Sequence, residues 1–239
     1  MRIAIMQSSF LPWRGYFDLM ACVDRFVLFD DVAFVSKSWR SRNQIKTAAG
    51  VSWISVPVRH AWPRLSIDQT PLDDDQDWRG RITGQIRAAY GRAPFFRRYG
   101  EPLFALLAQS YPSISALNES LLRWVADELS IATPIVQARS FAAQGQGEDR
   151  VLDLLEKLGA TVFVNGPSAE AYSTPERYDR AGIALFFKLY DYQPYPQLHG
   201  DFRGDVSAID MLFNLGPAAA EHLRSVLAMR PASGAGGGR

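Results

Sequence analysis

The chain has 239 residues, of which 47% are hydrophobic and 12% aromatic, which is enough for a packed core and excludes a disordered chain. Its 26 basic and 25 acidic residues nearly cancel, so a strongly basic nucleic-acid binder is excluded. Cys22 is the single cysteine, which excludes an internal disulfide and a paired-cysteine zinc site. The sequence shows neither a signal peptide nor an apolar run of about 18 residues that could span a membrane, so we expect a cytoplasmic protein.

The first 31 residues have the element order of an α/β fold. Residues 3–6 predict a strand, 7–15 a loop, 16–22 a helix and 26–29 a second strand that runs into Asp30 and Asp31. Strand, helix and strand in this order predict a βαβ unit. In open α/β sheets, ligands bind at the carboxyl ends of the strands, so the loops that begin at Gln7 and Asp30 are candidate site loops.

A hairpin and a helical segment follow. Residues 45–47 and 51–58 are apolar runs on either side of a short Gly-containing turn, which predicts a β-hairpin. From 78 to 130, apolar residues recur at helical spacing, and we expect this segment to form a helical accessory lobe.

The α/β pattern then returns. We predict strands at 134–138, 161–164 and 183–187, and helices at 149–158, 175–180, 207–215 and 217–229. The prediction is a single α/β domain over residues 1–230, with a mostly parallel Rossmann-like sheet and a helical insert at 78–130. Residues 231–239 are rich in Gly, Ser and Ala, which predicts a disordered tail.

The standard phosphate-loop, dinucleotide, nucleophile-elbow and zinc-protease motifs are absent from the sequence. The sharpest acidic feature is the pair Asp30 and Asp31 at a strand end. One interpretation is a carboxylate that binds a metal, a ribose or an amine; the other is a turn residue beside a helix cap.

Two polar loops carry further candidates. Residues 39–43 combine the Trp39 ring, the Arg40 and Arg42 guanidinium groups and the Asn43 amide, a set that suits a phosphate-bearing ligand but also a solvated loop. Residues 191–203 hold Tyr195, Gln197 and His199 in a turn-rich stretch, which is typical of a functional loop or of a lid packed on the body. We expect loops 7–15, 30–43, 165–172 and 195–210 to converge on one cleft.

Motifs along most of the chain resemble the WbqC-like family. They are IAIMQ at 3–7, FLP at 10–12 followed by Gly15 and Tyr16, FVLFDDV at 26–32, Trp39 with Arg42 and Asn43, WISVPV at 53–58, APFF at 93–96, Asn165 and Gly166, Ser168 with Tyr172, Tyr195 with Gln197, and Asp210 with Asn214. The resemblance covers about residues 1–216 and departs from the family pattern at Ser8 and Ser9. It implies a cytoplasmic enzyme of bacterial surface polysaccharide biosynthesis, such as O-antigen assembly in lipopolysaccharide, that acts on nucleotide-activated sugars. A fainter likeness links residues 10–16 to the nucleotidyltransferase loop, although both of that loop's histidines are missing.

The resulting hypothesis is a transferase that moves an acyl or aminoacyl-type group onto a nucleotide-linked amino sugar. Asp30, Asp31 and His199 are the candidates for catalysis, since the sugar amine must lose a proton. The candidate ligand-binding residues are Gln7, Tyr16, Trp39, Arg42, Asn43, Ser168, Tyr172, Tyr195, Gln197, Asp210 and Asn214. No residue is predicted as a resident metal ligand. The alternatives are a metal-dependent glycosyl- or nucleotidyltransferase with Mg²⁺ on Asp30 and Asp31, and a non-catalytic nucleotide-sugar binding module.

Overall fold

A computed structural model describes residues 1–59, 64–225 and 229–232. Its main sheet has six strands in the order β5-β2-β1-β6-β7-β8. Their bounds are β1 (Arg2–Met6), β2 (Arg25–Leu28), β5 (Ile135–Gln137), β6 (Val162–Asn165), β7 (Ala184–Lys188) and β8 (Met229–Pro231). The first five of these pair in parallel, and β8 runs antiparallel to β7. The five strands predicted from the sequence are confirmed, each within one residue at either end.

The order of the parallel strands confirms the Rossmann-like prediction. From β1 the chain adds β2 and β5 on one side, then crosses back to add β6 and β7 on the other side. The direction of winding therefore changes between β1 and β6, where Ile3 pairs with Phe163. In sheets of this kind, the loops on either side of such a switch point separate and leave a crevice at the carboxyl ends of the strands.

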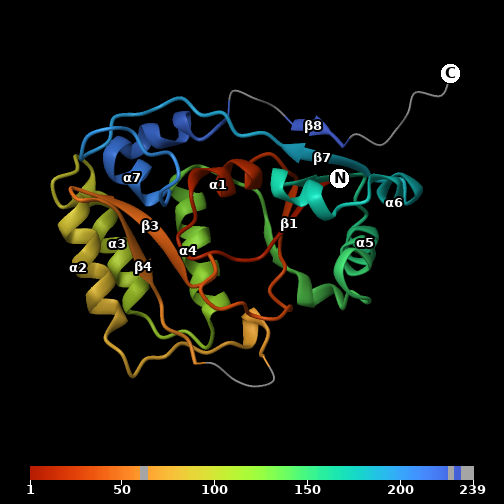
Figure 1. Ribbon diagram of the computed structural model, residues 1–239, viewed down its shortest axis with the longest axis horizontal. Coiled ribbons are helices and arrows are strands. Elements are labelled where there is room, and N and C mark those ends of the chain that lie inside the picture. The colour runs from red at the N-terminus through yellow and green to blue at the C-terminus, as the bar shows by residue number, and fades with distance from the viewer. Residues whose placement is uncertain (60–63, 226–228, 233–239) are drawn as a thin grey trace.

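Each face of the sheet is covered by helices, because both faces of its parallel strands carry apolar side chains. Alternate residues of β1 point to opposite faces: Ala4 joins the larger core, and Ile3 and Ile5 join the smaller one. The larger core includes α1 (Arg14–Met20) and α7 (Ile209–Leu215), and the smaller one α5 (Gly147–Lys157) and α6 (Pro175–Arg180). Figure 1 shows α5 and α6 at one end of the molecule, away from α2, α3 and α4.

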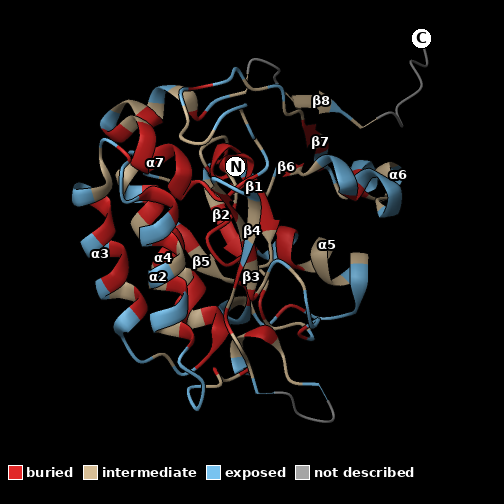
Figure 2. Cartoon of the chain, turned by 60° about the vertical axis from the view of Figure 1, so that its left-hand side comes forward, coloured by how far each residue is buried: buried red, intermediate tan, exposed pale blue. Residues whose placement is uncertain are grey.

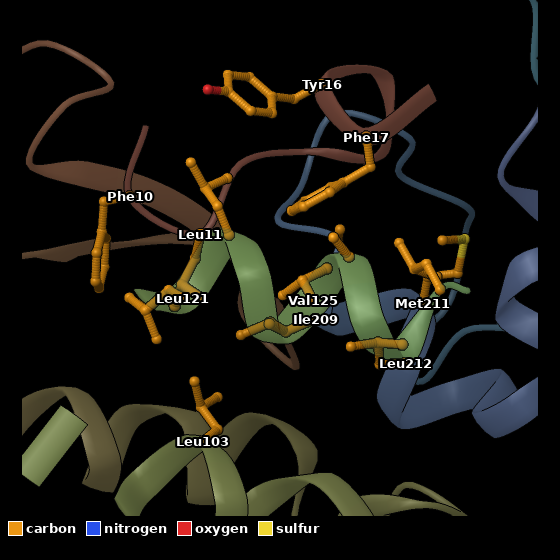
Figure 3. Close-up of a cluster of buried hydrophobic side chains, with 14 of the residues drawn as sticks. Phe10, Leu11, Tyr16, Phe17, Leu103, Leu121, Val125, Ile209, Met211 and Leu212 are labelled. Atoms are coloured by element: carbon orange, nitrogen blue, oxygen red, sulfur yellow. The ribbon is translucent and has the colours of Figure 1, made fainter. Parts of the chain in front are cut away.

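The predicted helical segment is α2 (Trp78–Tyr90), α3 (Phe96–Ala108) and α4 (Ile114–Glu128). These helices share the larger core with the sheet. In Figure 3, Leu121 and Val125 of α4 lie between Phe17 of α1 and Leu103 of α3. The inner faces of the three helices are buried and their outer faces exposed, as Figure 2 shows.

The predicted hairpin is also present, as β3 (Arg42–Thr47) and β4 (Gly50–Ser55). Gly50 has φ +105°, a backbone conformation that side chains with a Cβ rarely adopt, which explains the glycine in this turn. The Lys46 amide donates to the Tyr90 hydroxyl at 3.0 Å, so the hairpin is fixed to α2. The described residues also form the short 3-10 helices η1 (Ile67–Gln69), η2 (Ala138–Phe141), η3 (Pro167–Tyr172) and η4 (Gly216–His222).

The prediction of a helix over 217–229 is wrong. The 3-10 helix η4 ends at His222, residues 226–228 lie outside the described residues, and Met229 begins β8. The hydrogen bonds that β8 makes to the edge strand β7 outweigh the helix propensity of this segment. Of the predicted tail, Pro231 lies in β8 and the Ala232 amide donates to the Leu185 carbonyl, whereas 233–239 lie outside the described residues.

Among the residues that the structure describes, no helix combines the length and the apolar character needed to cross a bilayer.

Candidate functional site

Two cavities adjoin each other at the carboxyl ends of β1 and β6, at the switch point of the sheet. We call the first, of about 560 Å³, the strand-end cleft; its lining includes Gln7, Phe29, Glu148, Val151, Phe163, Asn165 and Tyr172. We call the second, of about 760 Å³, the tryptophan cleft; its lining includes Trp13, Tyr16, Trp39, Arg42, Asn43, Trp53, Ser168 and Asp205. Both volumes are in the range of small-molecule sites. Met6 and Arg40 line both clefts, so the two are contiguous.

All four loops that the sequence predicts to converge contribute to the tryptophan cleft. Loop 7–15 supplies Trp13, loop 30–43 supplies Trp39 and Arg42, loop 165–172 supplies Ser168, and loop 195–210 supplies Asp205. The loops after β1 and β6 meet there because parallel strands end at the same edge of the sheet.

A flat, cationic surface forms one wall of the tryptophan cleft. The rings of Trp39 and Trp53 lie 5.4 Å apart, tilted by 34°, and are 49% and 40% exposed. The Arg42 guanidinium lies 4.3 Å from the centre of the Trp53 ring. Trp53 faces outward because side chains alternate along β4 and its neighbour Ile54 points into the core. Exposed aromatic rings beside a guanidinium are suited to stack on a planar ligand and to bind an anion.

Tyr16 and Asn43 line the same cleft from more buried positions. The Tyr16 hydroxyl donates to the Gln7 carbonyl at 3.1 Å, and burial raises the pKa of this hydroxyl, so it stays neutral. The Asn43 side chain donates to the Phe10 carbonyl at 3.0 Å and accepts from the Gln44 amide at 2.8 Å. These contacts fix the first loop against the hairpin.

Arg40 separates the two clefts and has unused hydrogen-bonding capacity. Its terminal nitrogens donate to Gln7 Oε1 at 2.5 Å and to Ser9 Oγ at 2.6 Å. Its Nε is buried without an acceptor, and Arg40 forms no ion pair with any residue that the structure describes. Burial lowers the pKa of Arg40, although Tyr16 and Asp30 act in the opposite direction. A guanidinium has five N–H donors, of which two are used and one is the buried Nε–H, so two terminal N–H groups remain for an anion in the clefts.

The strand-end cleft is polar at its rim and apolar at its floor. Gln7 and Asn165 stand at the ends of β1 and β6, and Tyr172 on η3 is 70% exposed. Glu148, at the start of α5, accepts from the Thr174 amide at 2.7 Å and pairs with Arg177 at 2.9 Å.

Asp30 and Asp31, two of the three catalytic candidates, line neither cleft. Asp30 is 1% exposed and accepts hydrogen bonds from the Ser8 amide at 2.7 Å and from Ser115 Oγ at 2.5 Å. Burial raises the pKa of Asp30, and the hydrogen bonds from Ser115 and Ser8 oppose that shift. Asp31 forms an ion pair with Arg150 through Oδ2, while its Oδ1 is buried without a hydrogen-bond partner. Asp30 thus ties the first loop to α4, and Asp31 ties the second loop to α5.

Four other candidates form a separate buried cluster around Asp210. This carboxylate accepts from Tyr195 at 2.9 Å, from Tyr90 at 3.0 Å and from Gln197 at 2.8 Å. The Asn214 side chain donates to Asp210 Oδ1 at 3.2 Å and accepts from the Leu198 amide. Burial raises the pKa of Asp210. None of the four lines either cleft. Their hydrogen bonds fix the loop 195–203 against α7.

His199, the third catalytic candidate, lies in that loop with φ +69°. One of its ring nitrogens is 2.7 Å from the Ala89 carbonyl at the end of α2, and the residue is not part of either cleft. The structure therefore brings seven of the predicted residues to the clefts: Gln7, Tyr16, Trp39, Arg42, Asn43, Ser168 and Tyr172.

The cleft residues that were not among those candidates include Arg40, Trp53 and Glu148. Arg40 belongs to the same 39–43 motif, and only its burial distinguishes it from a solvated arginine. Trp53 could be predicted from the alternation along its strand, which places a large aromatic ring opposite the buried Ile54. Glu148 has no comparable signal, since it reads as an ordinary acidic residue in the first turn of a helix.

Within the described part of the chain, no group of three or more His, Cys, Asp or Glu side chains could hold a metal ion.

The model of the WbqC-like protein family matches residues 7–222. The chain is 35% identical over 225 residues to "Uncharacterized protein Rv1507c" of Mycobacterium tuberculosis, covering 93% of this chain and 97% of that relative. No solved structure matches.

Proposed function

The chain belongs to the WbqC-like protein family, and from this membership and the geometry of its clefts we propose that it is a transferase of bacterial surface polysaccharide biosynthesis. Its substrate is a nucleotide-linked amino sugar bound in the tryptophan cleft. The observation that carries the proposal is the stack of Trp39, Trp53 and Arg42 beside the unpaired Arg40, at the switch point of the sheet.

The chemistry of these side chains matches the parts of such a substrate. A nucleobase is planar and stacks on an exposed aromatic ring. A diphosphate accepts paired hydrogen bonds from the planar fork of a guanidinium. The half-buried Arg40 guanidinium forms no ion pair with a described residue, and desolvating such a group costs free energy, which a bound anion offsets.

The reaction that we propose is the transfer of an acyl or aminoacyl-type group to the sugar amine. The amine nitrogen forms a bond to the carbonyl carbon of the donor, the donor's leaving group departs with the electron pair of the broken bond, and the amine loses a proton. Glu148 is the carboxylate of the strand-end cleft, and it is better placed to accept that proton than Asp30, Asp31 or His199, which line neither cleft.

A second candidate is a non-catalytic module that binds nucleotide sugars. The observation that favours it is that the acids are already engaged within the protein. Asp30 is bonded to Ser8 and Ser115, Asp31 is paired with Arg150, and Glu148 is paired with Arg177. Both candidate functions require the same ligand in the tryptophan cleft. They differ in whether the protein catalyses a reaction of that ligand or only binds it.

Calorimetric titration tests the proposal. The probes are three matched pairs: UDP and UDP-glucose, dTDP and dTDP-glucose, and GDP and GDP-mannose. We expect at least one pair to bind, and we expect Trp53→Ala to weaken that binding by about tenfold, since an aromatic stack contributes about 1–3 kcal/mol per base. Arg87→Met is the matched control, because Arg87 lies on α2 outside both clefts and pairs with the exposed Glu101. Failure of all three pairs to bind, or binding that is unchanged by Trp53→Ala, contradicts the proposal.

Titrations with EDTA present test the metal-dependent alternative. We expect the measured affinities to be unchanged, because the ligand's charge is met by Arg40 and Arg42. Loss of binding in EDTA that is restored by Mg²⁺ would favour a metal-dependent enzyme instead.

A further inference from the structure

We infer that the two clefts are two halves of one binding site, in which Arg40 holds the diphosphate, the tryptophan cleft takes the nucleoside and the strand-end cleft takes the sugar. This inference rests on the proposed function and assigns an orientation to its ligand.

The first argument is the position of Arg40. It is one of two residues that line both clefts, and its partners Gln7 and Ser9 lie one on each side: Gln7 lines the strand-end cleft and Ser9 the tryptophan cleft. A nucleotide sugar has its charge in the middle and a neutral group at each end. Arg40, as the cation shared by both clefts, stands where the diphosphate lies in that order.

The second argument is the state of the Arg40 side chain. Gln7 Oε1 and Ser9 Oγ orient the guanidinium, but both are neutral acceptors, and its buried Nε has no acceptor. Two fixed hydrogen bonds reduce the rotamer entropy that would be lost on binding an anion. Arg40 is therefore oriented in advance. The buried Asp30 carboxylate attracts its charge, but no carboxylate of the described residues lies within ion-pair distance of the guanidinium.

The third argument is the difference between the two linings. The tryptophan cleft presents rings and Arg42, which suit a base. The strand-end cleft presents hydrogen-bonding groups, including Gln7, Asn165 and Glu148, above apolar side chains such as Val151 and Phe163. A sugar combines hydroxyl groups with apolar C–H faces, so it is the half of the ligand that matches this second lining. The reverse orientation would place the base beside Tyr172, the most exposed ring of that lining, which has no aromatic or guanidinium neighbour among the described residues.

Two variants of the strand-end cleft test the orientation. Tyr172→Ala removes a ring that is 70% exposed and forms no hydrogen bond with a described residue, so the fold should be unaffected. Val151→Phe adds volume at the half-buried floor of the cleft. The measurement is the affinity of each variant for both members of a matched pair, for example UDP and UDP-glucose, dTDP and dTDP-glucose, or GDP and GDP-mannose.

We expect both variants to bind the sugar nucleotide about tenfold more weakly, equivalent to about 1.4 kcal/mol, while the diphosphate binds as it does to the unchanged protein. Trp53→Ala should weaken both members of the pair by the same factor. Equal effects of Tyr172→Ala and Val151→Phe on both members, or no effect on either, overturn the orientation but leave the proposed function standing. Failure of every pair to bind the unchanged protein overturns both.

Discussion

Replacing Arg40 by Met separates a binding role for this residue from a structural one. The substitution keeps a side chain of similar length and removes the charge. It also removes the hydrogen bonds to Gln7 and Ser9, whose side chains line the clefts. We expect the ligand-free protein to keep its stability and to lose most of its affinity for nucleoside diphosphates.

Two opposing contributions set the expected stability. Each hydrogen bond from a charged donor contributes about 1.5–3 kcal/mol, so losing two of them destabilises the variant. Removing a half-buried cation that forms no ion pair relieves a desolvation cost of several kcal/mol, from which the lost attraction between Arg40 and the Asp30 carboxylate is subtracted. The two nearly cancel, and we expect a net change within about 1 kcal/mol, which corresponds to about 2–4 °C in Tm for a chain of this size.

Binding carries no such compensation. If the diphosphate accepts from two of the free Arg40 N–H groups, their loss costs about 3 kcal/mol or more, which is about 100-fold in Kd. Thermal melting of the free protein and calorimetric titration with UDP, dTDP and GDP measure the two quantities. Arg40→Lys is a second variant, which keeps the positive charge but lacks the planar guanidinium. We expect its affinity to lie between those of the unchanged protein and Arg40→Met. A fall in Tm of more than about 8 °C in Arg40→Met, with an unchanged Kd, would falsify the binding role.

Three further outcomes are expected. Arg42→Lys should weaken diphosphate binding by about tenfold and leave Tm unchanged, because Arg42 stacks on Trp53 and is paired with neither Asp30 nor Asp31; a lower Tm with unchanged Kd would show a structural role. Asp30→Asn should alter how stability depends on pH. Burial raises the pKa of Asp30 in the folded protein above its ordinary value of 3.8. Protonation of Asp30 therefore adds its full contribution to the free energy of unfolding below pH 3.8, and this contribution is lost as pH rises through the raised pKa. The urea midpoint of the unchanged protein minus that of Asp30→Asn should therefore fall as pH rises from about 4, and a flat difference contradicts the raised pKa. Glu148→Gln should lower the ratio of the affinity for UDP-glucosamine to that for UDP-N-acetylglucosamine by about fivefold, because a neutral amide does not balance the charge of the sugar's ammonium group. An unchanged ratio excludes Glu148 as the contact of the amine.

The fold could be predicted largely from local patterns. Short apolar runs rich in branched residues define the five parallel strands, and the apolar spacing from 78 to 130 defines three helices. The C-terminal strand β8 could not be predicted in this way, because Met229–Pro231 is a strand only through its pairing with β7. Its sequence continues a stretch of good helix formers, and the competing partner is about 40 residues away in the chain.

The candidate site was predictable where a residue's role depends on its neighbours in sequence. The 39–43 motif lies at the tryptophan cleft because the loop after β2 must end at that edge of the sheet. Asp30 follows the same strand, yet its carboxylate is turned inward by Ser8 and by Ser115, which is 85 positions away. Likewise Asp210 is enclosed by Tyr90 from the helical segment. Hydrogen-bond donors from remote elements decide whether such an acid faces a ligand or the core, and no local pattern reveals them.

The strand order also constrains when the site can form. The crevice lies between β1 and β6, and the pairing of Ile3 with Phe163 joins residues 160 positions apart. Contacts of such long sequence separation close late and slow folding, because the entropy of the intervening chain must be lost first. During synthesis, β1 and β2 can pair as soon as residue 28 has left the ribosome, but one wall of the strand-end cleft is missing until β6 has followed. The strand-end cleft is therefore incomplete until β6 has been translated, and a ligand that binds there can act only on a late stage of folding.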